Sequence, residues 1–282
     1  MKTGKSHLSY SEIKSWVDCA WRHKLTHVEK LGKNEKNIFS DFGGIIHETL
    51  EVYLQHRTMD VAGALSKIEA VWLERNYPNN AGWPTYPAAV PNLQYWLDTA
   101  TSMLEAAPVF LEAKFPGWQF VSAEEQLYID IDGLPVQFKG YVDAIIKTKR
   151  KNGKEVFHIL DWKTAGPQGW NFRKVRDPTV LMQLVLYKHF WAKKNNLSTK
   201  DVKCGFILLK RLEPDVKKRK KAEKIKMVPG FISVSAGPKS TERSLKIIRN
   251  MVNALDKSLF LKNKFMCLFC EFYNTEHCKL NL

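Results

Sequence analysis

The sequence has no run of about 18 uncharged apolar residues, so it predicts no membrane-spanning helix. The first residues, MKTGKSHLSYSEIKSW, lack the apolar core of a signal peptide, and we therefore expect an intracellular, cytoplasmic protein. Cysteine is scarce, with five in 282 residues, which argues against a disulfide framework in such a chain. No internal repeat is present.

Acidic residues are outnumbered by basic ones. Lysine and arginine number 44 against 29 for aspartate and glutamate, which gives a net charge of +15. This charge favours a polyanionic partner, because each neutralised phosphate releases condensed counterions. General solubility and binding to an anionic membrane surface are the alternative explanations of this charge. We favour a nucleic-acid partner. With 44% apolar and 12% aromatic residues, the chain is predicted to be a single globular domain over 1–282.

The first 118 residues are predicted to be mainly helical. Ile46, Leu50 and Leu54, for example, are spaced four apart, as on one face of a helix. The expected helices cover 8–30, 43–56, 61–76 and 92–113.

Residues 119–210 change to a strand-rich pattern and form the expected core. Turn signals at Asp132-Gly133 and Asn152-Gly153 join the first three strands into a meander, which makes neighbours antiparallel. A helix from 240 is expected to end in the cysteine-rich tail of 240–282. The expected strands are 119–131, 135–147, 155–163, 202–210 and 225–235, with a helix at 178–194. This is an α/β class, a mixed central sheet flanked by helices.

Two aspartates and a lysine lie on neighbouring predicted strands. Asp161 and Lys163 are two apart, so their side chains share a face, and Asp143 lies at a register where it can meet Asp161. Two carboxylates can hold Mg²⁺ or Mn²⁺ through oxygen ligands. A lysine beside them can orient or deprotonate a water and offset the charge of a phosphate under attack.

The ordinary interpretation of a D-x-K tripeptide is a solvated salt bridge. Here Val142 precedes Asp143, and Ile159 and Leu160 precede Asp161, so both acids close apolar strands. Burying a carboxylate is costly without a partner, and a metal ion is such a partner. The pattern therefore favours a metal site for phosphodiester hydrolysis.

Further motifs follow one another along the chain. They are Gly43-x-x-x-His47-x-x-Leu50, Glu125 before a strand, Gly140-x-x-Asp143, Asp161-x-Lys163-Thr164 and Gln183-x-x-x-Tyr187. In this order they resemble the PD-(D/E)xK nuclease superfamily, in the branch of RecB and of the CRISPR-associated RecB-like and AddB-type nucleases. The resemblance runs from about residue 8 to the C-terminus and implies a restriction-endonuclease-like core. The chain departs from the family pattern in lacking a proline before Asp143.

The resemblance also implies a role for each matched residue. Asp143 and Asp161 would ligate the catalytic metal, and Lys163 would position the attacking water and the scissile phosphate. His47 would be a further ligand that supports manganese use, unless it is a core histidine. Glu125 would be an outer acidic residue near the site, a role for which Glu124 competes.

The resemblance also concerns two residues of a predicted helix. Gln183 and Tyr187 are four apart on one face of a predicted helix. The resemblance implies that they contact the DNA backbone or brace the lysine, with core packing of Tyr187 as the alternative.

The cysteines are unevenly placed. Cys267-x-x-Cys270 and Cys278 form a local group of soft ligands near the end of the chain. In some members of the family one N-terminal and three C-terminal cysteines hold a [4Fe-4S] cluster, which implies Cys19 as the fourth ligand here. The spacing between Cys270 and Cys278 is longer than the usual one. His277 leaves open a zinc site instead, and unligated thiols are a third possibility.

A basic run interrupts the sequence between two strand-like segments. We predict that it contacts phosphates without base readout, or else is a solvated loop. Its residues are Lys217, Lys218, Arg219, Lys220 and Lys221.

The sequence thus predicts a Mg²⁺- or Mn²⁺-dependent DNA nuclease, an exonuclease on single-stranded or free-ended DNA, acting in recombination, repair or phage DNA metabolism. A helicase or recombination protein is a possible partner. The alternatives are a non-catalytic DNA-binding or complex-forming subunit on the same fold, and an RNA-directed protein. The preference for DNA rests on the family resemblance.

Overall fold

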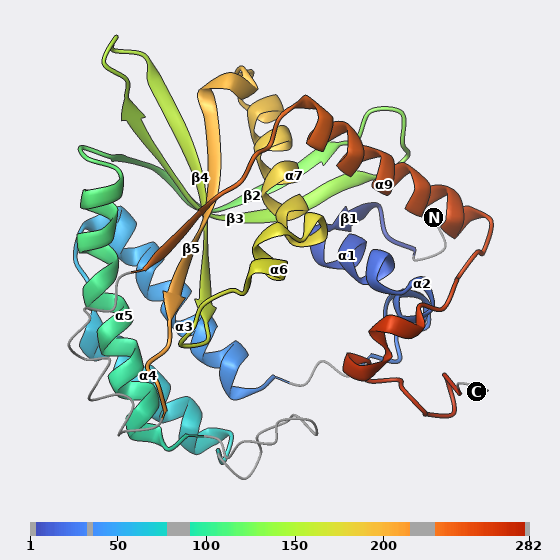
Figure 1. Ribbon diagram of the computed structural model, residues 1–282, viewed down its shortest axis with the longest axis horizontal. Coiled ribbons are helices and arrows are strands. Elements are labelled where there is room, and N and C mark those ends of the chain that lie inside the picture. Colours follow the sequence, from blue (N-terminus) through green and yellow to red (C-terminus); the bar gives the residue numbers. More distant parts are fainter. Residues whose placement is uncertain (1–3, 33–35, 78–90, 215–228, 280–282) are drawn as a thin grey trace.

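The computed structural model describes residues 4–32, 36–77, 91–214 and 229–279. One six-stranded mixed sheet lies between two layers of helices (Figure 1). The basic run 217–221 lies outside the described residues. Within the described part, no helix is long and apolar enough to cross a membrane.

The predicted meander forms the centre of the sheet. Strands β2 (Gln119–Asp130), β3 (Gln137–Lys149) and β4 (Glu155–Ala165) pair antiparallel in sequence order, as the two Gly-containing turns predict. Strand β5 (Val202–Lys210) pairs parallel to β4, and β6 (Gly230–Ser233) closes the sheet antiparallel to β5. The sheet is therefore mixed, as expected from the sequence.

A short strand, β1 (His7–Ser9), was not predicted from the sequence. It pairs parallel with residues 137–139 of β3, whereas β4 pairs with residues 144–149 of the same strand. Residues 140–143 of β3 lie between the segment that pairs with β1 and the segment that pairs with β4. Three residues are too few to show strand periodicity, so the sequence could not reveal β1.

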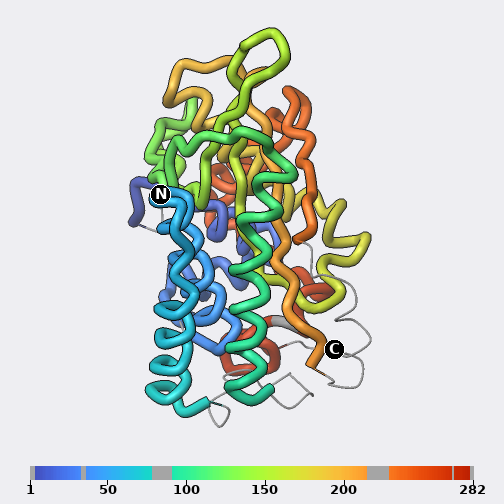
Figure 2. Tube along the Cα trace, turned by 90° about the vertical axis from the view of Figure 1, so that its left-hand side faces the viewer, coloured from blue at the N-terminus to red at the C-terminus, as the bar shows by residue number. Residues whose placement is uncertain are grey.

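The helices α3 (Ile38–His56), α4 (Val61–Glu74) and α5 (Leu93–Lys114) cover one face of the sheet. Figure 2 shows α4 and α5 side by side, and the two helices contact each other. Helix α3 begins before the expected residue 43, because Asn37 and Ser40 form a capping box. Trp96, Trp162 and Ile207 are among the side chains buried in this layer.

The other face carries α7 (Pro178–Lys194) and α9 (Pro238–Asp256), with α1 (Tyr10–Asp18) beside α7. The predicted helix at 8–30 is divided. The extended Cys19, at φ −163°, separates α1 from α2 (Ala20–His23), and a π-helical turn η1 (Lys24–Val28) follows α2 directly. A five-residue helix, α6 (Phe172–Arg176), precedes α7.

The N-terminal helices and the C-terminal tail lie side by side (Figure 1). Helix α9 ends at Asp256, before the cysteines that the sequence placed at its end. The tail instead contains a 3-10 turn, η3 (Lys264–Phe269). A short turn η2 (Thr199–Asp201) precedes β5.

Candidate active site

Asp143 lies in the stretch of β3 between the residues that pair with β1 and the residues that pair with β4. Its Oδ2 accepts a hydrogen bond of 2.9 Å from the backbone N–H of Trp162, in β4. Beside it, Gly140 leaves room for α7, since a Cβ there would approach the Tyr187 ring to 2.7 Å. At Asp143 the backbone of β3 pairs with neither β1 nor β4, and the Asp143 carboxylate makes the contact with β4 instead.

Asp161 and Lys163 form an ion pair in β4. Lys163 Nζ lies 2.6 Å from Oδ2 of Asp161, whose side chain is only 1% exposed. In the described chain no hydrogen-bond donor reaches Oδ1 of Asp161. A buried carboxylate oxygen without a donor fits a metal ion, which would supply the missing partner.

Three further ligand atoms converge beside this pair. His47, Glu124 and Asp143 each offer one atom, and these atoms lie within 4.8 Å of one another. His47 Nδ1 is 3.3 Å from Oδ2 of Asp143. His47 and Glu124 line a hollow of about 360 Å³, together with Gly43, Gly44, Glu48 and Glu51. An imidazole and two carboxylates form a donor set that suits a divalent cation.

The two aspartates resist ionisation. Burial and the neighbouring Asp143 raise the pKa of Asp161 to about 7, despite Lys163. Burial also raises the pKa of Asp143 to about 6, with Lys163 opposing and Glu124 adding to the rise. Two neighbouring carboxylates that resist ionisation when buried are stabilised in their charged form by a cation.

Burial alone would lower the pKa of Lys163, but the carboxylates of Asp161 and Asp143 raise it above its ordinary value. Burial lowers the pKa of His47, which favours the neutral imidazole. A neutral imidazole can donate a lone pair to a metal, whereas the protonated ring cannot.

Glu124, rather than Glu125, lies beside Asp143. Glu124 has a left-handed φ of 46°, and the pairing passes from Ala123 with Ala144 to Glu125 with Val142. The Glu125 carboxylate accepts hydrogen bonds from Ser122, Trp191 and Lys194 instead. The sequence could not choose between two consecutive glutamates, because an irregular φ decides which one reaches the site.

Gln183 and Tyr187 lie on one face of α7, as expected. Gln183 Nε2 is 3.5 Å from the Tyr187 hydroxyl. The pKa of Tyr187 is raised to about 12 by burial first, with contributions from Asp161 and Asp143. The Tyr187 ring is therefore buried on this side of the sheet, while its hydroxyl group lies close enough to Asp161 and Asp143 to be affected by their charges.

Lys174 and Lys14 lie outside the sequence motifs, and Lys174 lies close enough to both Lys163 and Lys14 to be affected by their charges. The pKa of Lys174, in α6, is lowered by burial and then by the positive charges of Lys163 and Lys14. Lys14 is paired with Asp18, with its Nζ 2.6 Å from Oδ2, whereas the ammonium group of Lys174 lies over the Trp170 ring. The sequence did not single out these residues, because each is an ordinary lysine at the start or middle of a helix.

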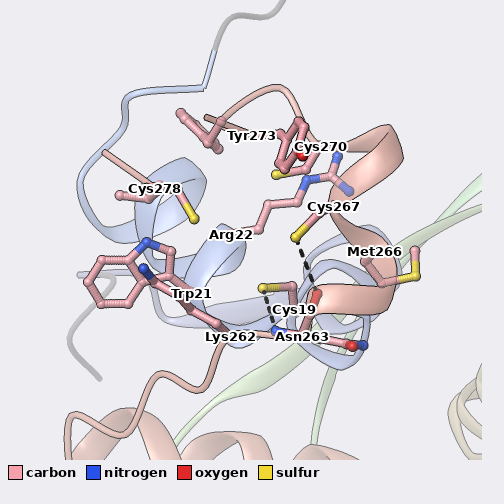
Figure 3. A pocket seen from close by; sticks show the side chains of 12 residues that line it. Cys19, Trp21, Arg22, Lys262, Asn263, Met266, Cys267, Cys270, Tyr273 and Cys278 are labelled. Carbon is pink, nitrogen blue, oxygen red and sulfur yellow. Dashed lines mark hydrogen bonds between the residues drawn. The ribbon is translucent and has the colours of Figure 1, made fainter. Parts of the chain in front are cut away.

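Four of the five cysteines line one cavity, formed where α1–α2 meets the tail (Figure 3). They are Cys19, Cys267, Cys270 and Cys278, and none of the five cysteines forms a disulfide. The Asn263 N–H points at Cys19 Sγ over 3.4 Å. Among the described residues, those that line the cavity include Cys19 but not His277. Cys204 is buried in β5, in the main core, as its apolar surroundings predict.

One of three comparisons with known proteins identifies the family of the chain. The family model described as "PD-(D/E)XK nuclease superfamily" matches residues 7–275. A solved structure titled "Crystal structure of SSO0001" is similar at 12% identity and a TM-score of 0.32, over 93% of each chain. No curated protein matches the chain.

Proposed function

The chain belongs to the PD-(D/E)XK nuclease superfamily, and from this premise we propose that it is a metal-dependent deoxyribonuclease. The observation that carries the proposal is the convergence of Asp143, Asp161 and Lys163 where β3 and β4 separate. The reaction would be the hydrolysis of a phosphodiester bond, in which water attacks phosphorus and the 3′ oxygen departs.

The metal would be held by Asp143 and Asp161, with His47 and Glu124 completing the donor set. Oxygen donors suit both Mg²⁺ and Mn²⁺, and the imidazole of His47 favours Mn²⁺. A divalent ion there would neutralise charge on the phosphate and lower the pKa of a bound water.

Lys163 would act on the water and on the phosphate. Asp161 fixes its ammonium group, and the pKa of Lys163, raised by the neighbouring carboxylates, keeps it charged. A fixed cation offsets the negative charge that builds up on the phosphate oxygens during attack. Gln183 and Tyr187 would brace this lysine from α7 or contact the DNA backbone.

Single-stranded or free-ended DNA is the proposed substrate. Lys174 adds positive charge near Lys163, and the whole chain carries a net charge of +15. Phosphate contacts of this kind are independent of sequence. We propose exonuclease action in recombination, repair or phage DNA metabolism, in line with the RecB-like branch that the motifs resemble.

We also propose that the cysteine cavity holds a [4Fe-4S] cluster. Four thiols from two ends of the chain face one cavity, which matches the thiolate set that such a cluster needs. The cluster would fasten the N-terminal helices to the tail and stabilise only the folded chain. The alternative is zinc held by three cysteines and either Cys19 or His277.

The cytoplasm is the proposed location. The cysteines are unpaired, and thiols or metal-bound thiolates persist in a reducing compartment.

Cleavage assays test the proposed function. Labelled single-stranded and duplex DNA would be incubated with the purified protein and Mn²⁺, Mg²⁺ or EDTA. We expect cleavage with either metal, none with EDTA, and none by the Lys163→Ala variant. Comparing end-blocked with free-ended DNA tests exonuclease action. Binding of DNA without any metal-dependent cleavage would instead support the non-catalytic alternative.

A further inference from the structure

The side chain of Arg22, in α2, lines the cysteine cavity. It lies there with Cys19, Cys267, Cys270 and Cys278 (Figure 3). Its Nε atom is buried, and in the described part of the chain no acceptor reaches it. A buried charged donor without an acceptor is costly, so Arg22 lacks a partner in this cavity.

The acidic residues of the N-terminal helices are paired with other cations. Residues 4–32 contain three carboxylates, and each forms an ion pair with another basic residue. The pairs are Glu12 with Lys5 and His23, Asp18 with Lys14, and Glu29 with Lys24. The described residues that line the cavity include no carboxylate. The part of the chain that the structure describes therefore offers Arg22 no negative charge.

Lys262, the second cation that lines the cavity, does have partners. Its Nζ donates to the carbonyl of Lys279 over 3.4 Å and lies 5.1 Å from the centroid of the Trp21 ring. Arg22 instead lies close enough to Cys270 for its charge to act on the thiol. Burial raises the pKa of Cys270, and the charge of Arg22 opposes this rise. The unpaired cation is thus near one of the proposed cluster ligands.

An anionic metal centre would supply the partner that Arg22 lacks. Four thiolates bring more negative charge than the iron ions of a [4Fe-4S] cluster neutralise, and reduction adds a further electron. Net charge and hydrogen bonds to the sulfur atoms set the reduction potential of such a cluster. A cation beside the thiolates therefore stabilises the reduced form more than the oxidised form.

We infer that Arg22 is the positive partner of the cluster in the cysteine cavity and raises its reduction potential. The inference rests on the proposed [4Fe-4S] cluster and concerns a residue that no sequence motif singles out. Arg22 acts through the cluster, as a positioning residue. A guanidinium group stays charged in proteins, so this effect does not depend on its titration.

The midpoint potential of the cluster tests the inference. Full-length protein would be purified anaerobically, and its iron content and visible spectrum measured before titration with dithionite and redox mediators. The variants are Arg22→Gln, which removes the charge, and Arg22→Lys, which retains it. The control is Arg249→Gln, which removes an exposed positive charge from α9.

Arg22→Gln should keep its iron and shift the reduction equilibrium at least about tenfold toward the oxidised form. For one electron this is a fall of about 59 mV in the midpoint potential. Arg22→Lys and Arg249→Gln should shift the potential much less. A merely structural role of Arg22 would lower the iron content without moving the potential of the clusters that remain.

An unchanged potential in Arg22→Gln, or an equal fall in Arg22→Lys, would overturn the inference. If Arg22→Gln purifies without iron, Arg22→Lys decides: retained iron supports a need for the charge, and lost iron overturns it. Failure of the proposed cluster is distinguishable. A wild-type protein with zinc and no iron would contradict the cluster and the inference together, whereas an unmoved potential in iron-containing protein contradicts only the role of Arg22.

Discussion

Asp143 is fastened to the neighbouring strand by the backbone N–H of Trp162, 2.9 Å from its Oδ2. Trp162 lies between Asp161 and Lys163, so this contact holds β3 next to the D-x-K segment of β4. Trp162 itself is 1% exposed in the helix-covered core. Packing of Trp162 in the core thus fixes Asp143, Asp161 and Lys163 relative to one another.

Lys163→Ala should lower the rate of DNA cleavage by about 10²- to 10⁴-fold, the contribution of a positioned acid–base group. The expected cause is the loss of a fixed cation beside the phosphate, with little change in DNA affinity. Single-turnover cleavage in Mn²⁺ would measure it. The matched control is Lys147→Ala, which removes a lysine of β3 that pairs with Glu155. Equal rates in both variants would contradict a catalytic role for Lys163.

His47→Asn should weaken Mn²⁺ binding by at least about tenfold, and Mg²⁺ binding less, since imidazole suits transition metals. Calorimetric titration of each ion at neutral pH would measure both affinities. Unchanged affinity for Mn²⁺ would show that His47 is a core histidine that only lies beside Asp143.

Glu124→Gln and Glu125→Gln should separate two neighbouring roles. Glu124 lies within the group of metal-ligand atoms, so its variant should bind metal more weakly and unfold at a similar temperature. Glu125 accepts from Ser122, Trp191 and Lys194, so its variant should lose about 1–3 kcal/mol of unfolding free energy and keep its metal affinity. Weaker metal binding in Glu125→Gln, with a loss of stability in Glu124→Gln, would instead favour Glu125 as the residue at the metal site.

Metal-free protein should lose stability relative to Asp161→Asn as pH rises. Burial and Asp143 raise the pKa of Asp161 to about 7 in the folded chain, whereas an unfolded aspartate titrates near about 4. Between these values the folded state binds more protons than the unfolded state. The contribution of Asp161 is therefore complete below about pH 4 and is lost as pH rises through about 7.

Thermal unfolding in EDTA, from about pH 4 to about pH 8, would show this effect. The melting temperature of the wild-type protein should fall relative to that of Asp161→Asn across the range, and added Mn²⁺ should reverse the fall. Parallel pH profiles of the two proteins would mean that Asp161 ionises normally.

Cys19→Ser should lower the iron content of anaerobically purified protein and loosen the contact between the N-terminal helices and the tail. Cys204→Ala is the control, since Cys204 lies in β5 away from the cavity. Iron analysis and the visible absorption spectrum would measure the result. A colourless protein that contains zinc, with metal content unchanged in Cys19→Ser and reduced in His277→Ala, would favour the zinc site.

Strong local patterns made most of the fold predictable. The apolar run before Asp161 and the Gly-containing turns gave the meander of β2, β3 and β4 and placed Asp143 beside the D-x-K segment. Alternation along β4 also put Asp161 and Lys163 on one face. These features depend on residues close in sequence, which is why periodicity shows them.

Features that depend on distant contacts were missed. Strand β1 is defined only by its pairing with β3, and Glu124 reaches the site only through a left-handed φ in β2. Helix α6 is five residues long and shows no full period.

A crystal soaked in Mn²⁺ and measured for anomalous scattering tests the central claim most directly. The account predicts one strong peak within about 2–2.5 Å of carboxylate oxygens of both Asp143 and Asp161, with His47 beside it. Lys163 Nζ should lie on the side of the ion where the substrate phosphate would bind. A peak that contacts only exposed acids such as Glu48 and Glu51, or no peak at all, would contradict a metal-dependent nuclease site at these residues.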